Sequence, residues 1–180
     1  MVELNRNFPE VAVADVKVAD TTKTALSPLL VCLPGSLMPG DQIRLKASGI
    51  FTTAGSATGT AKLDIMGGVT DSEAILITDT SSTLTASQTS AGWELEAVIT
   101  IRTITGDTDE DGTVTDGTLI GVMKINGDYQ TMVATPNGVV VCASTAIETD
   151  EENSFYLAVT MSGGAADNFI TCQQAAWEKI

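Results

Sequence analysis

The chain has 180 residues, of which 43% are hydrophobic and 4% aromatic; 9 Lys and Arg stand against 23 Asp and Glu, for a formal net charge of −14. This length suits one domain with its own core, and the negative charge argues against binding to nucleic acid or to an anionic membrane surface. Because the chain has no His, Ser-His-Asp and Cys-His catalytic sites and zinc hydrolase sites are excluded.

We therefore expect no enzyme, and the sequence offers no catalytic, cofactor-binding or metal-binding residue. Paired carboxylates that hydrolyse glycosides would still need a cleft lined by aromatic side chains, and the chain has only 2 Trp and 2 Tyr beside its 4 Phe. Solubility is the first explanation of the acidic balance, and attraction to a basic partner surface is the alternative.

Residues 1–24 differ from the rest of the chain. Their valines, between positions 11 and 18, are spaced irregularly among Ala and Asp, and no strong turn follows that would fold the segment back as a hairpin. Two interpretations stay open: a first strand at a sheet edge, or an extended arm that lies on a neighbouring subunit or another protein. We divide the chain into an N-terminal arm, 1–24, and a domain, 25–180.

The same segment lacks a basic region followed by a long apolar one, so we expect no signal peptide, and no apolar run reaches membrane-spanning length. Cys32, Cys142 and Cys172 each lie inside an apolar, strand-like run, and no pair has metal-ligand spacing. Free buried thiols are the favoured interpretation, which fits synthesis in a cytoplasm.

Two strands are predicted before residue 52. An apolar run at 28–33 ends at a Pro-Gly turn, and after a second Pro-Gly turn the residues of 42–51 alternate between polar and apolar. Gly49 interrupts this second strand, which indicates a bulge or a close approach of another backbone.

Shorter strands follow at 61–68 and 74–78. In the first of these, Leu63 and Ile65 alternate with Lys62 and Asp64.

The clearest strand is 93–104, within GWELEAVITIRTITG. One face is apolar and the other polar, the pattern of a half-buried strand, and no apolar stripe forms at helical spacing. The apolar face consists of Trp93, Leu95, Ala97, Ile99 and Ile101, and the polar face of Glu94, Glu96, Thr100 and Arg102.

An acidic loop follows this strand. Asp107, Asp109 and Asp111, followed by a Gly, match the start of a calcium-binding loop, but Thr118 stands where the bidentate acid belongs, and strands flank the loop in place of helices. An acidic hairpin tip without an ion is the favoured interpretation, and calcium binding is the alternative. The acidic run at 148–154 is expected to be a solvated loop.

Residues 119–125 alternate again, and 139–145 (VVVCAST) are apolar enough to be covered on both faces. Residues 155–161 and 169–172 predict a closing hairpin, and Trp177 and Ile180 suggest that the C-terminus is pinned to the body. With nine or ten strands and no helix, the predicted fold is an all-β antiparallel sandwich of jelly-roll type, with an immunoglobulin-like sandwich as the alternative.

Four stretches taken in order resemble the β-sandwich structural proteins of tailed bacteriophages: LPGSLMPGDQIRLKASGIFTT, GWELEAVITIRTITGD, GTLIGVMKI and SFYLAVTMSGGAADNFITCQQAAWEKI. The shared features are a strand that ends in a Gly-Phe or similar step, a Trp-x-Leu-x-Ala strand that runs into an Arg-Thr turn, and a closing unit with Thr-x-x-Gln. The resemblance covers residues 28–180; the segment 1–24 and the acidic insertion 107–117 fall outside it.

This resemblance implies a non-enzymatic capsid decoration, or cement, protein of the virion. Such a protein binds the major capsid protein on the outer head surface as a trimer and stabilises the shell by burying apolar and strand-edge surface. The outer face of strand 93–104 or the arm at 11–18 would make the contacts. The alternatives are a head-fibre or tail receptor-binding tip that uses loops 106–118 and 148–154, and, in another class, a carbohydrate-binding module.

Overall fold

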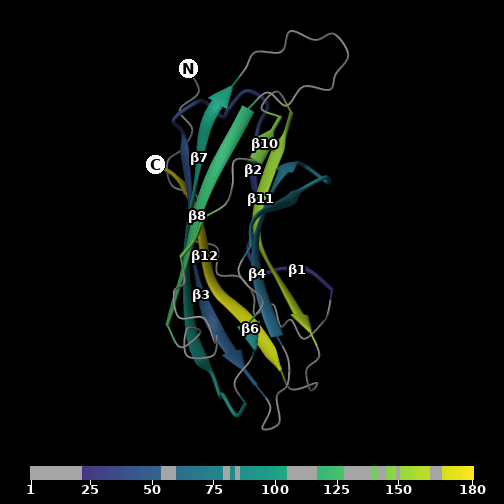
Figure 1. Ribbon diagram of the computed structural model, residues 1–180, viewed down its shortest axis with the longest axis vertical. Coiled ribbons are helices and arrows are strands. Elements are labelled where there is room, and N and C mark those ends of the chain that lie inside the picture. Colours follow the sequence, from purple (N-terminus) through teal and green to yellow (C-terminus); the bar gives the residue numbers. More distant parts are fainter. Residues whose placement is uncertain are drawn as a thin grey trace.

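The computed structural model describes residues 22–53, 60–78, 82–83, 86–104, 117–127, 139–141, 145–148, 151–162 and 168–180. Every regular element in these ranges is a strand, and all strand pairs are antiparallel (Figure 1). The antiparallel β-sandwich expected from the sequence is confirmed, while its jelly-roll type stays a prediction. No helix in the described ranges could serve as a membrane span.

The strands form two sheets, which we call sheet A and sheet B. Sheet A has the order β10-β8-β7-β3-β12, with β9 also paired to β8. It contains β3 (Gln42–Thr52), β7 (Ala91–Ile104), β8 (Gly117–Gly127), β9 (Val139–Val141), β10 (Thr145–Ile147) and β12 (Phe169–Lys179).

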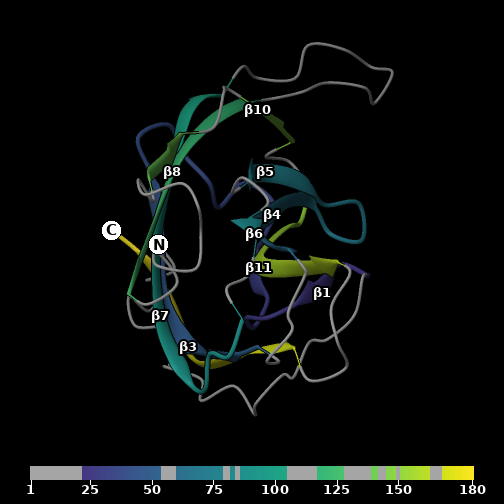
Figure 2. The ribbon, with the colours of Figure 1, turned by 60° about the horizontal axis from the view of Figure 1, so that its bottom comes forward.

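Sheet B has the order β1-β11-β4-β5, with β2 also paired to β11 and β6 to β4. It contains β1 (Thr24–Ala25), β2 (Leu30–Cys32), β4 (Thr60–Val69), β5 (Ala74–Thr78), β6 (Ser82–Thr83) and β11 (Asn153–Ser162). Figure 2 shows sheet A curving around sheet B, so that the concave side of sheet A faces the core.

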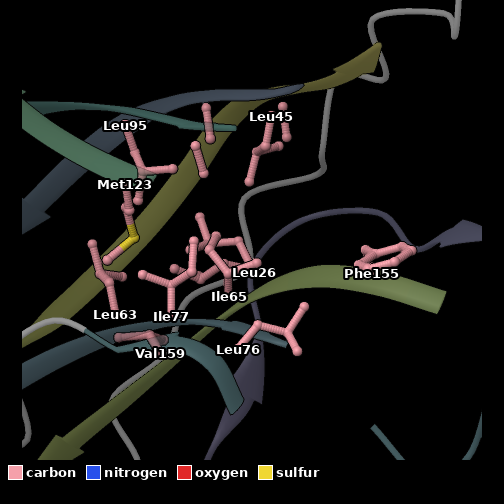
Figure 3. Packing of buried hydrophobic residues seen from close by; sticks show 14 of the residues in the cluster. Leu26, Leu45, Leu63, Ile65, Leu76, Ile77, Leu95, Met123, Phe155 and Val159 are labelled. Atoms are coloured by element: carbon pink, nitrogen blue, oxygen red, sulfur yellow. The ribbon is translucent and has the colours of Figure 1, made fainter. Parts of the chain in front are cut away.

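The core lies between the two sheets and is built by alternation along each long strand. In β7, the residues predicted to point inward, from Trp93 to Ile101, are all buried. Leu63 and Ile65 of β4 and Val159 of β11 meet them from sheet B (Figure 3). Each Leu or Ile that is fully removed from water contributes roughly 1.5–3 kcal/mol, so this apolar layer is the main stabilising feature of the fold.

Gly49 lies where the backbone of β12 approaches β3 most closely. A Cβ atom at position 49 would lie 1.9 Å from the carbonyl oxygen of Thr171 and 2.9 Å from the indole ring of Trp93. The same carbonyl accepts a hydrogen bond from Trp93 Nε1 at 3.1 Å, and the register of β12 against β3 shifts just beyond it, between Cys172 and Gln174. The close approach predicted from Gly49 is confirmed.

The hairpin predicted at 155–172 is wrong. β11 pairs with β4, β1 and β2 in sheet B, whereas β12 pairs with β3 in sheet A. The two strands face each other across the core, where the rings of Phe155 and Trp177 have centroids 6.4 Å apart. Alternation along a strand predicts which face points inward but not which strand it pairs with. For 139–145, β9 pairs with β8, and the side chains lie outside the described residues.

The first described residues belong to sheet B. β1 pairs with β11, so the predicted boundary between residues 24 and 25 falls inside a strand; residues 1–21 lie outside the described residues. Lys23 reaches Asp64 of β4, with its Nζ 3.2 Å from Oδ2.

Asp64 alternates with Leu63 and Ile65 along β4, and its side chain is fully buried. Its Oδ1 accepts a hydrogen bond from Thr78 Oγ1 at 2.6 Å, and Lys23 and Lys62 both form ion pairs with the carboxylate. Partners of this kind are what a buried charge requires. Asp64 therefore fastens the N-terminal strand and β5 to β4.

The C-terminal strand closes one flank of the sandwich. Trp177 Nε1 donates a hydrogen bond to the carbonyl of Pro28 at 3.2 Å, which joins β12 of sheet A to the segment between β1 and β2 of sheet B. The amide of Ile180 bonds to the carbonyl of Gln42. The C-terminus is pinned as predicted, although the side chain of Ile180 is exposed.

Replacing Gly49 with Ala is expected to lower the free energy of unfolding by about 3 kcal/mol, because the new methyl group overlaps a carbonyl that cannot move without breaking the bond to Trp93. Gly92→Ala is the matched control, since a Cβ there meets no atom within 4 Å. We expect the control to change stability by less than about 1 kcal/mol. Urea unfolding followed by tryptophan fluorescence measures both, and equal stability of the two variants would contradict the assignment.

Candidate interaction surfaces

The outer face of sheet A is polar. Glu94, Glu96, Thr100 and Arg102 of β7 point outward, as the sequence predicts. Between neighbouring strands, Lys46 of β3 and Lys124 of β8 lie opposite Glu96. Opposite charges directly across an antiparallel pair stabilise a sheet, so this face resembles an ordinary solvated surface.

Arg44 adds ion pairs to the same face. Its Nε donates to Glu178 of β12, and its Nη1 lies 3.8 Å from Glu96. The hydrogen bond from Arg44 lowers the pKa of the Glu178 carboxyl. Exposed pairs of this kind contribute little to stability, and they leave few unpaired charges for a ligand.

A shallow hollow of about 450 Å³ lies on this polar face. Its lining is polar or small except for Leu95, and consists of Lys46, Ala47, Ser48, Glu94, Leu95, Glu96, Gln174, Ala175 and Ala176. No aromatic ring is among them, and both Trp93 and Trp177 are buried in the core. The hollow therefore lacks the flat ring on which a sugar would stack.

The outer face of sheet B is different, because several apolar side chains are exposed on it, whereas sheet A exposes Val122 among its described residues. Leu29, Val31 and Leu33 are 49%, 44% and 63% exposed, while Leu30 between them is buried. The alternation shows that these three side chains point away from the core. Ile75 of β5, 41% exposed, lies opposite Met66 of β4 on the same outer face.

The strand register joins these residues into one surface. Tyr156 of β11 lies opposite Met66 of β4, and because Phe155 pairs with Leu30, Leu29 follows at the next position beside Tyr156. An apolar row therefore crosses the sheet from β5 to β2. We call Leu29, Val31, Leu33, Ile75 and Tyr156 the sheet B patch.

Acidic side chains border the sheet B patch. Ser154, directly opposite Val31, donates a hydrogen bond to Glu73. Burial and the charge of Glu73 raise the pKa of Tyr156. Glu152 precedes Asn153, the partner of Cys32, and so lies beside Leu33.

At the same end of β2, Met38 is also exposed, and its amide donates to the carboxylate of Asp41 at 2.7 Å. Lys179 Nζ is 2.6 Å from Asp41 Oδ2 and 3.4 Å from the carbonyl of Ser36. These contacts bring the C-terminus and the turn after β2 together.

Sequence reasoning missed the sheet B patch. Its strongest signal is the run LLVCL at 29–33, where both faces are apolar and the alternation is hidden. The other residues come from strands far apart in the chain, and only the strand register brings them together. The outer face of β7, which the sequence did single out, forms the solvated face of sheet A.

The possible calcium ligands Asp107, Asp109 and Asp111 lie outside the described residues. Within the described ranges, no group of three or more His, Cys, Asp or Glu side chains could hold a metal ion. Cys32 and Cys172 are free thiols, as predicted, and Cys142 lies outside the described residues.

Comparisons with known proteins give no family for this chain. No family model matches it, and no curated protein does. Among solved structures, a legume lectin-like domain from Entamoeba histolytica aligns over 97% of this chain and 91% of its own, at 10% identity and a TM-score of 0.31. A likeness this weak supports no inference about function.

Burial raises the pKa of Cys32 and of Cys172 to about 11 each, from an ordinary value of 9.0. In a Cys142→Ser variant at pH 8, we expect the remaining thiols to react with a disulfide reagent about 100-fold more slowly than they do in urea, because the thiolate is the nucleophile. Measuring the absorbance of the released thiol tests this, and equal rates in the two states would contradict it.

The same shift has a consequence for stability. The folded state holds these protons to a higher pH than the unfolded chain, so the stabilisation is complete below pH 9 and is lost as the pH rises through about 11. The urea midpoint of the same variant is expected to fall over this range, and a Cys172→Ala variant should show a smaller fall.

Proposed function

We propose that this protein is a non-enzymatic structural protein of a virion, a capsid decoration protein that binds the outer head surface as a trimer and stabilises it. The sheet B patch carries the proposal, because it is an exposed apolar surface on a chain with no catalytic His. A contiguous apolar patch on a sheet face marks a protein interaction site. The resemblance to β-sandwich structural proteins of tailed phages supplies the class of partner, the major capsid protein.

The mechanism needs no chemistry on the part of the decoration protein. Docking of the sheet B patch removes apolar side chains from water, at roughly 25 cal/mol for each Å² buried. A trimer presents the patch three times, so that after one copy has bound, the others bind at high effective concentration. A shell held across several subunits in this way resists internal pressure better than an undecorated one.

A carbohydrate-binding module is less well supported. Sugar recognition on a β-sandwich relies on aromatic rings at the surface; both tryptophans lie inside the core, and Tyr156 in the sheet B patch is only partly exposed. For the receptor-binding tip, most residues of loops 106–118 and 148–154 that would touch a host lie outside or at the limits of the described ranges. Neither alternative explains why the outer face of sheet B is apolar.

Co-sedimentation with empty shells, assembled from the major capsid protein of the same genome, tests the proposal. We expect saturable binding and a rise in the temperature at which the shells disassemble, since a ligand that binds only the assembled state stabilises it. Analytical ultracentrifugation of the free protein should show a trimer. A monomer that ignores the shells but binds to a glycan array would replace the proposal with the carbohydrate-binding module.

A further inference from the structure

We infer that the sheet B patch docks on a protein surface that has an apolar centre and a rim of Lys and Arg, and that it is not a contact between copies of this chain. The inference rests on the proposed function and names the chemistry of the site on the shell. It follows from the distribution of charge around the patch, which the strand register fixes.

The centre of the patch carries no charge. Leu29, Val31 and Leu33 are about half exposed or more and run along β2, the outermost part of sheet B on this side among the described strands. Tyr156 continues the apolar surface inward over β11. Such a centre gains free energy from any apolar surface of matching shape and does not by itself select a partner.

The rim selects the partner. The side chain of Glu73 reaches Ser154, directly opposite Val31, and Glu152 lies beside Leu33. Asp71 is exposed in the turn between β4 and β5, and Val69 of that turn's strand pairs with Asn153. These acidic groups therefore gather at the end of the sandwich where Leu33 lies.

Glu151 lies at this same end. Its carbonyl oxygen accepts a hydrogen bond from Asn153 Nδ2 at 3.0 Å, and its side chain is exposed. The basic residues described there are Arg102 and Lys179, and Lys179 is paired with Asp41.

The other end of the sandwich has the opposite character. Lys23 and Lys62 lie in that half of sheet B, and their common partner is the buried Asp64. In the described turn at 86–92 there is no acidic residue. The described acidic side chains that border the patch therefore lie at one end of it.

This polarity favours one of the two kinds of partner. Two copies joined through the patch with their Leu33 ends side by side would bring two acidic rims together, and like charges placed opposite each other oppose association. A partner with Lys and Arg around an apolar centre would satisfy both parts of the surface. It would also be steered to the acidic end before contact, because exposed charges act over about 10 Å at moderate salt.

The test uses co-sedimentation of the full chain with the same empty shells. Val31→Lys places a positive charge at the centre of the patch, where it would face the partner's apolar centre and lie near its basic rim, and should weaken binding about tenfold or more. Val122→Lys is the matched control, because Val122 is a Val of similar exposure, 41%, on the outer face of sheet A. We expect the control to bind within about twofold of the wild type. Circular dichroism and the urea midpoint confirm that both variants are folded.

Salt provides the second measurement. Raising NaCl from about 50 mM to about 500 mM should weaken binding of the wild type, because screening removes the attraction between the rims. Binding that strengthens with salt would overturn the charge assignment, since it would indicate an apolar contact between like-charged surfaces. The sedimentation coefficient of free Val31→Lys should match that of the wild type, and a loss of the oligomer in this variant would overturn the inference by making the patch a contact between copies.

Failure of the inference is distinguishable from failure of the proposed function. If the wild type and Val31→Lys bind the shells equally, the shells are the partner but the patch is not the docking surface. This result overturns the inference and leaves the proposed function standing. If the wild type does not bind the shells at all, the decoration role falls, and the inference falls with it.

Discussion

The fold depends on one place where a side chain is missing. Because residue 49 is Gly, the backbone of β12 comes close enough to β3 for the carbonyl of Thr171 to accept a hydrogen bond from the buried indole of Trp93. β12 shifts register just beyond this point and then continues to Trp177, which bonds to Pro28 and closes the flank of the sandwich. The position of β2, and with it the exposed apolar surface, follows from that closure.

The two sheets use their outer faces differently. On sheet A, charges of opposite sign lie across from one another, as in the row of Lys46, Glu96 and Lys124, and the face is stable in water. On sheet B, the buried pair of Lys23 and Asp64 holds the N-terminal strand in place, and apolar side chains extend from β5 to β2. An exposed apolar sheet face promotes aggregation of a protein that stays alone, whereas a partner in an assembly covers it.

The residues that could carry chemistry are used for structure. Both tryptophans are in the core, two of the three cysteines are free thiols whose burial raises their pKa, and most of the described acids pair with Lys or Arg or border the sheet B patch. The feature that remains available for function is the sheet B patch, which has an apolar centre and an acidic rim. Such a surface fits a protein whose role is to bind another protein, and its charge distribution restricts which surfaces it can bind.

The sequence by itself determined the fold class and the inward face of the long strands, because alternation along one strand is a local property: Trp93 to Ile101 and Leu119 to Ile125 occupy the places their spacing predicts. It also indicated the close approach at Gly49. Only the tertiary structure decided which strands share a sheet, and so separated β11 from β12, because pairing depends on contacts between residues far apart in the chain. The sheet B patch belongs to this second kind of information. Leu29, Ile75 and Tyr156 are ordinary residues in the sequence, and the strand register makes them one surface.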